Sequence, residues 1–380
     1  MSYSFIKVIF EQQFLNVFEP NKCNRKGKVT MQREAMSDVQ LSEGLNHDVD
    51  MPQGDYMEDF AQLVIAESED YDLCFVPNLW HVGGGKSGYW QVDKALMIQT
   101  TFMMIPKNKR GKMHNNEFIS NRLDPKDWVD TDFSIKQVGD SIVWKTQKME
   151  FISRPPFWEI KGDHMGIQYN MLFGGIGKAI RSGGLWEDLP KTLRAGYDHF
   201  CWVEGDITVG GKKHVLKNAY GLHERLTFGK TYDPVTSMRK PYNWVLGMND
   251  KYRIYFFVLP GEEKIGQGQI SINDEKLAFG LGDISVKDME MWIDPLTGMQ
   301  VPSRWEFKLN SKDGKVDLEI AAGGRSIFTV ASHTGTTVRY AYSCLINGQA
   351  IFADGRKADI NDVMAYMEWG KSAFPLQAGI

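Results

Sequence analysis

The chain of 380 residues has few cysteines and no long apolar run. Its 4 cysteines form neither a CxxC pair nor a zinc-binding pattern, so we expect reduced, mostly buried thiols at Cys23, Cys74, Cys201 and Cys344. No segment approaches the roughly 18 apolar residues that a membrane-spanning helix needs. The apolar start of the chain is interrupted by polar residues 11–13, and no clear cleavage site of a signal peptide follows. These absences predict a cytoplasmic protein without a transmembrane segment.

An excess of charge of either sign is missing too. The chain has 44 Lys and Arg against 48 Asp and Glu, and it contains no Lys/Arg-rich block, which argues against a nucleic-acid partner. With 42% hydrophobic and 24% charged residues, the composition is that of a soluble globular protein long enough for two domains. Aromatic residues (12%) and 19 methionines can fill a core or line an adaptable apolar pocket.

The motifs of several cofactor and metal sites are also missing. The segment "GGGKSG", residues 83–88, has Trp80 where a phosphate-binding loop needs its first glycine. The segment "FGGIGKAIRSGG" lacks the spacing of a dinucleotide-binding turn, and there is no GxSxG, HxH or HExxH motif. The sequence therefore predicts no metal and no cofactor, and it argues against serine hydrolysis.

The chain does contain many short strand patterns. Runs such as "KALMIQTTFMMI", "YRIYFFVL" and "SRWEFKL" are rich in β-branched and aromatic residues, and "VGGKK", "NSKDGK" and "ADGRK" are candidate hairpin turns. Long helical periods are scarce, although the pattern of "NDVMAYMEWGKS" near the end also allows a helix. We predict an all-β protein of many antiparallel strands, preceded by a polar, poorly regular N-terminal extension over residues 1–60.

A repeated hairpin pattern predicts two domains. Residues 205–224 and 348–368 both contain a strand, a glycine-containing turn, a second strand, then Ala-Tyr and a nearby Glu. A segment with two prolines, residues 231–244, lies between them and marks the boundary. We therefore assign residues 61–240 to a first barrel domain and residues 241–380 to a second.

The segment "AYGLHERLTFG", residues 219–229, has the densest set of polar and aromatic side chains. If residues 215–226 form a strand, side chains alternate between its faces. One face carries Tyr220, Leu222, Glu224 and Leu226, and the other carries Lys217, Ala219, Gly221, His223 and Arg225. A carboxyl group among apolar neighbours has a raised pKa and can act as a general acid near neutral pH. The alternatives are that Glu224 pairs with an arginine of a neighbouring strand, and that His223 is a structural histidine.

The preceding strand, "YDHFCWVEGDITV", adds a second set of such side chains. It places Asp198, Phe200, Trp202 and Glu204 on one face, and Tyr197, His199, Cys201 and Val203 on the other. If the "GGKK" turn pairs this strand with residues 215–226, acidic and aromatic side chains meet in a small area. An apolar pocket with a few polar groups is the usual form of a small-molecule site.

The segment "WVEGDITVGGKKHVLKNAYGLHERLTFG" resembles a strand-turn-strand element of the two-domain lipocalin-like (calycin) family that includes carotenoid hydratases and pericyclase-type cyclases. "DMEMWIDPLTGMQVPSRWEFKL" and "LINGQAIFADGRKADINDVMAYMEWG" are similar to its second domain. The resemblance covers roughly residues 60–380, and Asn218 and Met364 replace a glycine of the family pattern. It implies two antiparallel β-barrels side by side, no redox cofactor, and matches of family tyrosine and acidic positions to Tyr220, Glu224, Tyr366 and Glu368.

Together these observations predict a cofactor-independent enzyme that hydrates, isomerises or cyclises an apolar, unsaturated small molecule of terpenoid, carotenoid or polyketide type. The alternative is a non-enzymatic carrier of a hydrophobic ligand. The expected catalytic residues are Glu224, Asp198, His223, Tyr366 and Glu368. The expected ligand-binding residues are Trp202, Tyr220, Trp158, His199 and Arg225. The sequence does not indicate the oligomeric state.

Overall fold

The computed structural model of the chain describes residues 56–82, 95–113, 119–120, 122–123, 129–130, 133–181, 194–229, 242–259, 265–280, 282–332 and 335–373. Most of these residues lie in strands joined by short turns, and no α-helix occurs among them. The turns predicted at "VGGKK", "NSKDGK" and "ADGRK" each join two strands, at residues 210–211, 312–313 and 353–356. The all-β class is therefore confirmed.

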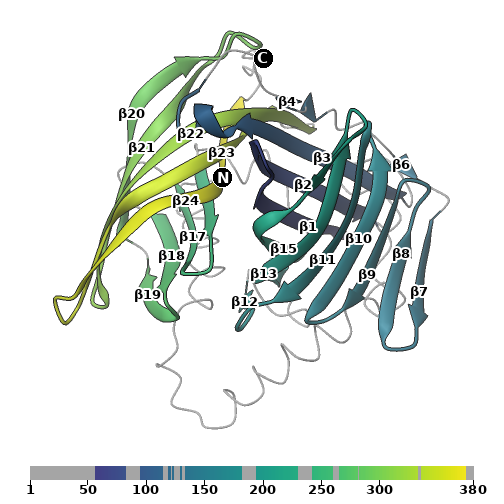
Figure 1. The fold of residues 1–380 in the computed structure, drawn as a ribbon, viewed down its shortest axis with the longest axis horizontal. Helices are drawn as coiled ribbons and strands as arrows, with labels where there is room; N and C mark the ends of the chain where they lie inside the picture. The colour runs from purple at the N-terminus through teal and green to yellow at the C-terminus, as the bar shows by residue number, and fades with distance from the viewer. Residues whose placement is uncertain are drawn as a thin grey trace, which may run out of the picture.

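The strands form two curved sheets that lie side by side (Figure 1). The first sheet runs in the order β4-β3-β2-β1-β15-β13-β11-β10-β9-β8-β7, with β6, β12 and β14 off this path. Its strands are β1 (Tyr56–Glu67), β2 (Tyr71–Val82), β3 (Ala95–Pro106), β4 (Ile119–Ser120), β6 (Val129–Asp130), β7 (Ser134–Val138), β8 (Ser141–Lys145), β9 (Met149–Arg154), β10 (Phe157–His164), β11 (Ile167–Gly175), β12 (Ile180–Arg181), β13 (Arg194–Val209), β14 (Lys212–Val215) and β15 (Lys217–Gly229). A 3-10 turn, η2 (Lys107–Lys109), follows β3.

The second sheet runs in the order β19-β18-β17-β16-β24-β23-β22-β21-β20. Its strands are β16 (Tyr242–Met248), β17 (Tyr252–Leu259), β18 (Ile265–Ile272), β19 (Glu275–Phe279), β20 (Ile284–Ile293), β21 (Gln300–Ser311), β22 (Gly314–Ser332), β23 (Gly335–Phe352) and β24 (Lys357–Ala373). The short strand β5 (Arg122–Leu123) pairs in parallel with β22, so part of the segment expected in the first domain joins the second sheet. This sheet curls on itself, because β18 approaches β20 and β19 approaches β21.

The segment "NDVMAYMEWGKS", for which a helix was possible, is part of the strand β24. This strand lies between β16 and β23, and both neighbours take up its backbone hydrogen bonds. Apolar side chains are buried on both of its faces, because Val363 points into the second sheet while Met364 points toward the first. Burial on both faces removes the polar–apolar alternation that would have indicated a strand.

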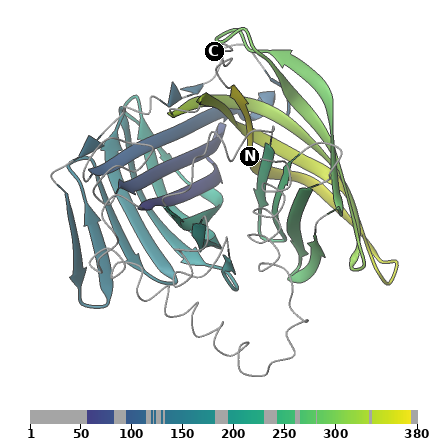
Figure 2. The same ribbon diagram turned by 180° about the vertical axis from the view of Figure 1, so that it is seen from behind.

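The apolar side chains form three cores. One lies on the concave side of each sheet, and the third lies between the sheets. The core between the sheets contains Leu63 and Phe200 of the first sheet with Leu246 and Tyr366 of the second. Because alternate residues of a strand face opposite ways, β15 contributes Leu222 to this shared core and places its neighbours inside the first sheet. Figure 2 shows the same two curved sheets from behind, side by side as in Figure 1.

The two sheets repeat one topology. The order β2-β1-β15-β13-β11 of the first matches the order β17-β16-β24-β23-β22 of the second. Gly205 of β13 and Gly348 of β23 both lie so close to a neighbouring strand that a Cβ atom would be 2.1 Å from a carbonyl oxygen. In the long strand that pairs with each, β15 or β24, a non-glycine residue has a positive φ, which is 46° for Asn218 and 49° for Asp362. The repeated hairpin seen in the sequence is therefore a repeat of structure.

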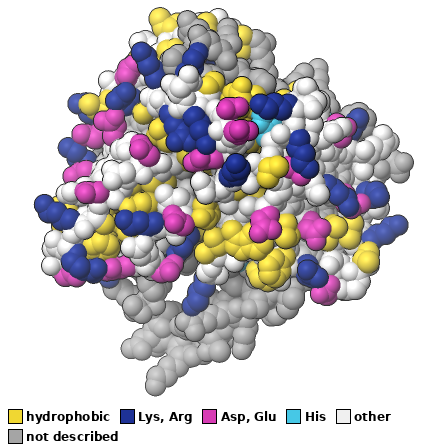
Figure 3. Space-filling view, in the orientation of Figure 1, with side chains coloured by type: hydrophobic (Ala, Val, Ile, Leu, Met, Phe, Trp, Pro, Cys, Tyr) yellow, Lys and Arg dark blue, Asp and Glu magenta, His cyan; other side chains and the backbone are white. Residues whose placement is uncertain are grey.

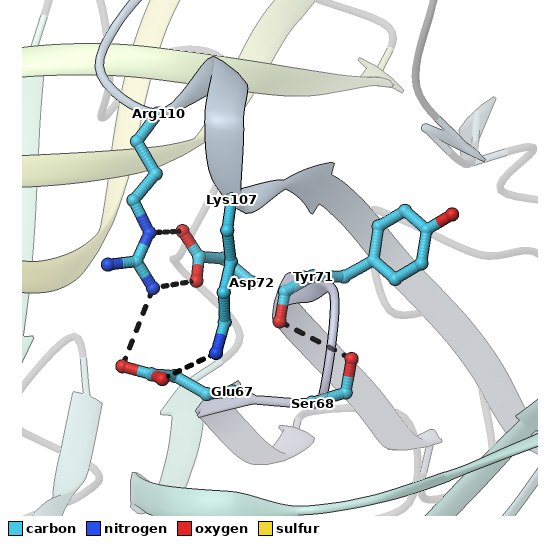
Figure 4. Close-up of polar contacts among 6 residues, drawn as sticks. All are labelled: Glu67, Ser68, Tyr71, Asp72, Lys107 and Arg110. Carbon is cyan, nitrogen blue, oxygen red and sulfur yellow. Dashed lines mark hydrogen bonds and ion pairs between the residues drawn. The ribbon is translucent and has the colours of Figure 1, made fainter.

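Ionic contacts fasten the segment after β3 to the first sheet (Figure 4). Lys107 Nζ lies 2.8 Å from Glu67 Oε2, and Arg110 Nε donates a hydrogen bond of 2.6 Å to Asp72 Oδ2. A second Arg110 nitrogen also contacts Asp72 and lies 3.4 Å from Glu67 Oε1. The next residue, Gly111, lies against Leu345 of the second sheet. The ion pairs of Lys107 and Arg110 thus fix the position of the segment that contacts the second sheet at Gly111.

Several features expected from the sequence lie outside the described residues. They are the N-terminal extension up to residue 55, the "GGGKSG" segment and most of the linker at 231–244. The described part of the first sheet begins at Tyr56, before the expected end of the extension at residue 60, and ends at Gly229. The second sheet begins at Tyr242, within the expected linker, if the short strand β5 is set aside.

Candidate active site

The residues expected to form one site lie on opposite faces of the first sheet. Asp198, Tyr220 and Glu224 point toward the second sheet, because they share strand parity with Phe200 and Leu222 of the core between the sheets. Tyr366 and Glu368 point toward the first sheet from β24. These five residues define what we call the inter-sheet site. His199, His223, Arg225 and Trp158 lie instead on the concave side of the first sheet.

Two carboxyl groups of the inter-sheet site come from adjacent strands. The pairing of β13 with β15, predicted from the "GGKK" turn, sets Asp198 directly opposite Glu224. Asp198 is fully buried, and its Oδ2 accepts a hydrogen bond of 2.9 Å from the hydroxyl of Tyr255 on β17. The ring of Tyr255 also packs against Phe200, with centroids 6.4 Å apart. A hydrogen bond and an aromatic contact, both made by Tyr255, thus join the two sheets at this point.

A third carboxyl group, that of Glu368, is held by two tyrosines. The hydroxyl of Tyr366 donates to Oε1 over 2.7 Å, and the hydroxyl of Tyr242 donates to Oε2 over 3.0 Å. Burial, together with the neighbouring Glu368, raises the pKa of Tyr366 well above its ordinary value, so this phenol remains a donor. The guanidinium of Arg339 lies 5.8 Å from the centre of the Tyr242 ring, which brings a positive charge to this side of the site.

An aromatic side chain connects the two groups of carboxylates. The ring of Trp244 meets the edge of Tyr255 at 6.4 Å and that of Tyr366 at 5.8 Å. The series Asp198, Tyr255, Trp244, Tyr366 and Glu368 therefore runs continuously across the face shared by the two sheets. An acidic group stands at each end of the series and three aromatic side chains lie between them, which is the composition of a site for an apolar molecule with a few oriented polar groups.

Side chains of the inter-sheet site keep some access to solvent. Glu224, Glu368, Trp244 and Tyr220 are partly exposed, whereas Asp198 is 0% and Tyr366 1% exposed. Both glutamates therefore keep part of their surface exposed. Trp202, which was expected among the ligand-binding residues, lies further along the same face of β13, where it covers Gly174 and packs against Phe157.

The concave side of the first sheet contains a second polar group, centred on His223. Its Nδ1 lies 3.1 Å from Gln62 Nε2, and its Nε2 lies 3.4 Å from the hydroxyl of Tyr197. The ring of Trp158 stacks on the imidazole with centroids 4.2 Å apart. His223 and Trp158 are both 0% exposed, so a ligand reaches them only after other side chains move.

Arg225 and His199 extend this buried group. The guanidinium of Arg225 lies 4.3 Å from the centre of the Phe60 ring and donates a hydrogen bond of 3.0 Å to Thr227. His199 Nε2 lies 3.3 Å from the carbonyl oxygen of Gly177. The structure thus brings together the four expected residues His199, His223, Arg225 and Trp158. They lie on the opposite face of the first sheet from Asp198 and Glu224.

Three further residues contact the inter-sheet site and were not predicted from the sequence. Tyr242, Trp244 and Tyr255 belong to β16 and β17, which follow the linker and showed only a general strand pattern. The alternation of aromatic residues in "PYNWVLGM" marks one face of a strand. That this face meets Asp198 is a consequence of how the sheets dock, which no local pattern records.

The described residues contain no group of three or more His, Cys, Asp or Glu side chains that could hold a metal ion. Within the same residues no helix is long and apolar enough to span a membrane. Cys74, Cys201 and Cys344 are free and buried, as expected, whereas Cys23 lies outside the described residues. On the face shown in Figure 3, basic side chains are scattered among acidic ones rather than gathered in one patch.

Comparison with solved structures identifies the fold. A protein from Nitrosomonas europaea, provisionally identified as AttH, superposes with a TM-score of 0.53 over 84% of this chain and 96% of its own, at 11% identity. CghA superposes with a TM-score of 0.54 over 84% of this chain and 89% of its own, at 10% identity. CghA with Sch210972 gives 0.52 over the same shares. The protein has a lipocalin-like fold.

The expected arrangement of two lipocalin-like barrels side by side is therefore confirmed. Identities of 10–11% relate these proteins by fold alone. No family profile matches the sequence, and no curated protein matches it. The chemistry of this protein has to be argued from its own residues, because one fold supports many activities.

Proposed function

We propose that the protein is a cofactor-independent enzyme that acts on an apolar, unsaturated small molecule of terpenoid, carotenoid or polyketide type. The reaction is hydration, isomerisation or cyclisation driven by proton transfer at the inter-sheet site. The observation that carries the proposal is the position of Glu224, which is partly exposed, lies opposite the buried Asp198 and shares its face of β15 with Leu222 of the core between the sheets. A carboxyl group in such surroundings can donate a proton near neutral pH.

The neighbouring aromatic side chains supply what such a reaction needs besides a proton. Trp244 and Tyr220, which are partly exposed, hold an extended apolar molecule against the carboxyl groups, and positioning of this kind lowers the barrier to reaction. Their ring faces also attract the positive charge that develops when a double bond is protonated. Each of the three candidate reactions moves protons and electron pairs within the substrate and water, so none requires an oxidant.

The comparison with CghA supports the proposal through the shared fold. CghA, which shares the fold, has a crystal structure with Sch210972. The substrate of the present protein is proposed from its apolar and aromatic site and not from that compound.

The first test identifies what the protein binds. The full-length protein is incubated with an extract of apolar metabolites, recovered, and its ligands are identified by mass spectrometry. Each ligand is then incubated with fresh protein, and the mixture is analysed by chromatography and mass. A product that differs from the ligand in mass or retention time supports the enzyme. Tight retention of an unchanged ligand supports the carrier instead.

A matched pair of variants places the activity. Glu224→Gln removes the proposed proton while keeping the shape of the side chain. Glu204→Gln makes the same change on β13 at an exposed position. Product formation that falls with the first variant and not with the second supports the inter-sheet site. Equal activity of both would assign the reaction to other residues.

A further inference from the structure

The concave side of the second sheet carries polar side chains within its apolar core. Tyr340 and Tyr342 of β23 and Trp369 of β24 belong to the core on this side. Asn243 of β16 lies directly opposite Trp369, and Tyr340 lies opposite Trp369 on its other side. Residues directly opposite each other in an antiparallel pair share a face, so Asn243 points the same way. Glu368, the neighbour of Trp369, faces the inter-sheet site instead, so the two polar groups are separated by the sheet.

Four aromatic rings form a continuous series on this concave side. The rings of Trp305 and Tyr342 meet edge to face, with centroids 5.2 Å apart. Tyr342 stacks beside Tyr340 at 5.9 Å, and Tyr340 meets Trp369 at 6.0 Å. The series therefore runs from β21 to β24, and flat ring faces of this kind pack well against another ring-shaped molecule.

Two side chains of the series carry polar groups that lack a partner. Tyr342 and Trp305 are both 0% exposed, and neither the Tyr342 hydroxyl nor the Trp305 Nε1–H makes a hydrogen bond within the part of the chain that the structure describes. Both amide atoms of Asn243, which is also 0% exposed, lack a partner among the same residues. Buried polar groups are nearly always hydrogen-bonded, because an unpartnered one destabilises the protein. Three such groups on one face indicate a site whose hydrogen-bond partner comes from outside the chain.

The unpartnered groups are mainly hydrogen-bond donors. An indole N–H can only donate, and the Asn243 amide offers two N–H donors beside its oxygen. Burial, together with the neighbouring Tyr340, raises the pKa of Tyr342 well above its ordinary value, so the hydroxyl keeps its proton. Carbonyl oxygens, which only accept, complement such a set of donors.

The charged groups on this side favour an uncharged ligand. Arg325 lies opposite Tyr342 on β22, and its guanidinium is already paired with Asp294 at 2.6 Å. Asp288 lies opposite Trp305 on β20, which adds a second acidic group on the same face. Two acidic groups against one basic group oppose the burial of an anion, and hydrogen-bond donors do not suit a cation.

One end of the aromatic series lies close to the protein surface. The hydroxyl of Tyr340 lies 2.7 Å from Oγ1 of Thr297, which is exposed on the turn between β20 and β21. Trp292 and Met299, next to this turn, are partly exposed and pack against the core of the second sheet. The buried rings therefore begin directly beneath a surface turn.

We propose that the concave side of the second sheet is a second binding site, for an uncharged, flat, ring-shaped molecule whose carbonyl oxygens accept hydrogen bonds from Tyr342 and Trp305. Asn243 lies on the same face for a further polar atom of the ligand. This inference goes beyond the proposed function and does not depend on it, because the two sites share no residue.

The test compares two probes of nearly the same shape. The flat aromatic ketone 9-fluorenone has one carbonyl group, and fluorene has a CH₂ group in its place. Equilibrium dialysis against the full-length protein measures the affinity of each. We expect 9-fluorenone to bind at least about fivefold more tightly, the usual effect of one hydrogen bond. The carbonyl-stretching frequency of the bound ketone should lie below its value in an apolar solvent, because the oxygen accepts hydrogen bonds.

A matched pair of variants locates the binding. Tyr342→Phe removes one donor and should lower the affinity for 9-fluorenone about 5- to 10-fold, with little change for fluorene. Tyr169→Phe is the control, because it removes a buried hydroxyl that also lacks a partner among the described residues but lies in the first sheet. It should change neither affinity. Trp305→Phe removes the other donor, and with the carbonyl frequency in the wild type it keeps the test decisive if Tyr342→Phe does not fold.

Three results would overturn the inference. The first is 9-fluorenone binding no more tightly than fluorene or not at all, as expected if ordered water alone occupies the site. The second is unchanged affinity for the ketone in folded Tyr342→Phe and Trp305→Phe. The third is binding that is lost in Trp244→Phe and kept in Tyr342→Phe, which would assign the ketone to the inter-sheet site and leave the proposed function intact. Conversely, absence of any turnover would remove the enzyme without affecting this second site.

Discussion

The hydroxyl of Tyr255 donates a hydrogen bond of 2.9 Å to Oδ2 of Asp198, and these two side chains belong to different sheets. Asp198 is 0% exposed and Tyr255 is 7% exposed, so the bond lies within the core between the sheets. Asp198 lies opposite Glu224, the proposed acid. The surroundings of Glu224 therefore depend on how the two sheets dock.

Removal of this hydroxyl should weaken the contact between the sheets. In Tyr255→Phe, a buried carboxyl oxygen loses its phenol donor, and we expect a loss of about 1–3 kcal/mol in the free energy of unfolding. Chemical denaturation measures this loss. Tyr71→Phe, at a partly exposed position of the first sheet, is the control. An unchanged midpoint for Tyr255→Phe would show that the bond contributes nothing to stability.

The substitution Glu224→Gln should affect catalysis more than stability. A general acid contributes about 10² to 10⁴ to a reaction rate, so kcat should fall by a factor in this range while ligand binding is retained. The melting temperature should change little, because glutamine has nearly the same shape. If Glu224 is instead a structural partner of an arginine, the melting temperature falls and the folded fraction keeps its turnover.

An ion pair in the second sheet predicts loss of stability in acid. Asp294 is fully buried, and its Oδ1 lies 2.6 Å from the Arg325 guanidinium, while Oδ2 accepts hydrogen bonds from Tyr340 and Thr297. Burial by itself raises the pKa of Asp294, but the bonds from Arg325, from the amide of Leu296 and from Tyr340 outweigh it and lower the pKa below its ordinary value of 3.8. Protonation therefore favours the unfolded chain.

The sign of the pH dependence follows from this lowered pKa. The contribution of Asp294 is complete above 3.8 and is lost as the pH falls below that value toward the pKa of the folded state. We expect Asp294→Asn to be less stable than the wild type at neutral pH, with a difference that narrows below 3.8. Asp317→Asn, at an exposed site on β22, is the control. A difference that does not depend on pH would contradict the assignment.

The equivalence of the two repeats can be tested at their glycines. In Gly205→Ala or Gly348→Ala, the new methyl group would stand 2.1 Å from the carbonyl oxygen of Asn170 or Asp317, so the neighbouring strand has to move. Strain of this kind typically costs about 1–3 kcal/mol. We expect a loss from both variants in denaturation experiments, and the larger one from Gly205→Ala, because the φ of 143° at Gly205 also strains a residue with a side chain. Gly280→Ala, where the nearest atom is 3.8 Å away, should cost less. A large effect at only one of the two glycines would contradict their equivalence.

Much of the fold and part of the site were visible in the residues of the chain. Gly, Asn and Asp mark turns because they accept unusual backbone angles, and β-branched and aromatic residues mark strands, so several strands were predicted. The pairing of β13 with β15 was a hypothesis from the sequence, and the structure confirms it. Because successive side chains of a strand point to opposite faces, the sequence was enough to place Glu224 and His223 on opposite faces of the sheet. The sequence left both a helix and a strand open for the segment that forms β24, because both faces of this strand are buried and its pattern does not alternate.

The inter-sheet site itself depends on contacts between segments far apart in the chain. Nothing near Asp198 in the sequence indicates Tyr255, and nothing near Glu368 indicates Tyr242, because these pairs form only when strands from separate segments come together. Local residue choice thus decides which segments become strands and which side chains share a face, since these depend on neighbours along the chain. The docking of the two sheets decides which faces meet, since burial of apolar surface depends on shape over the whole molecule.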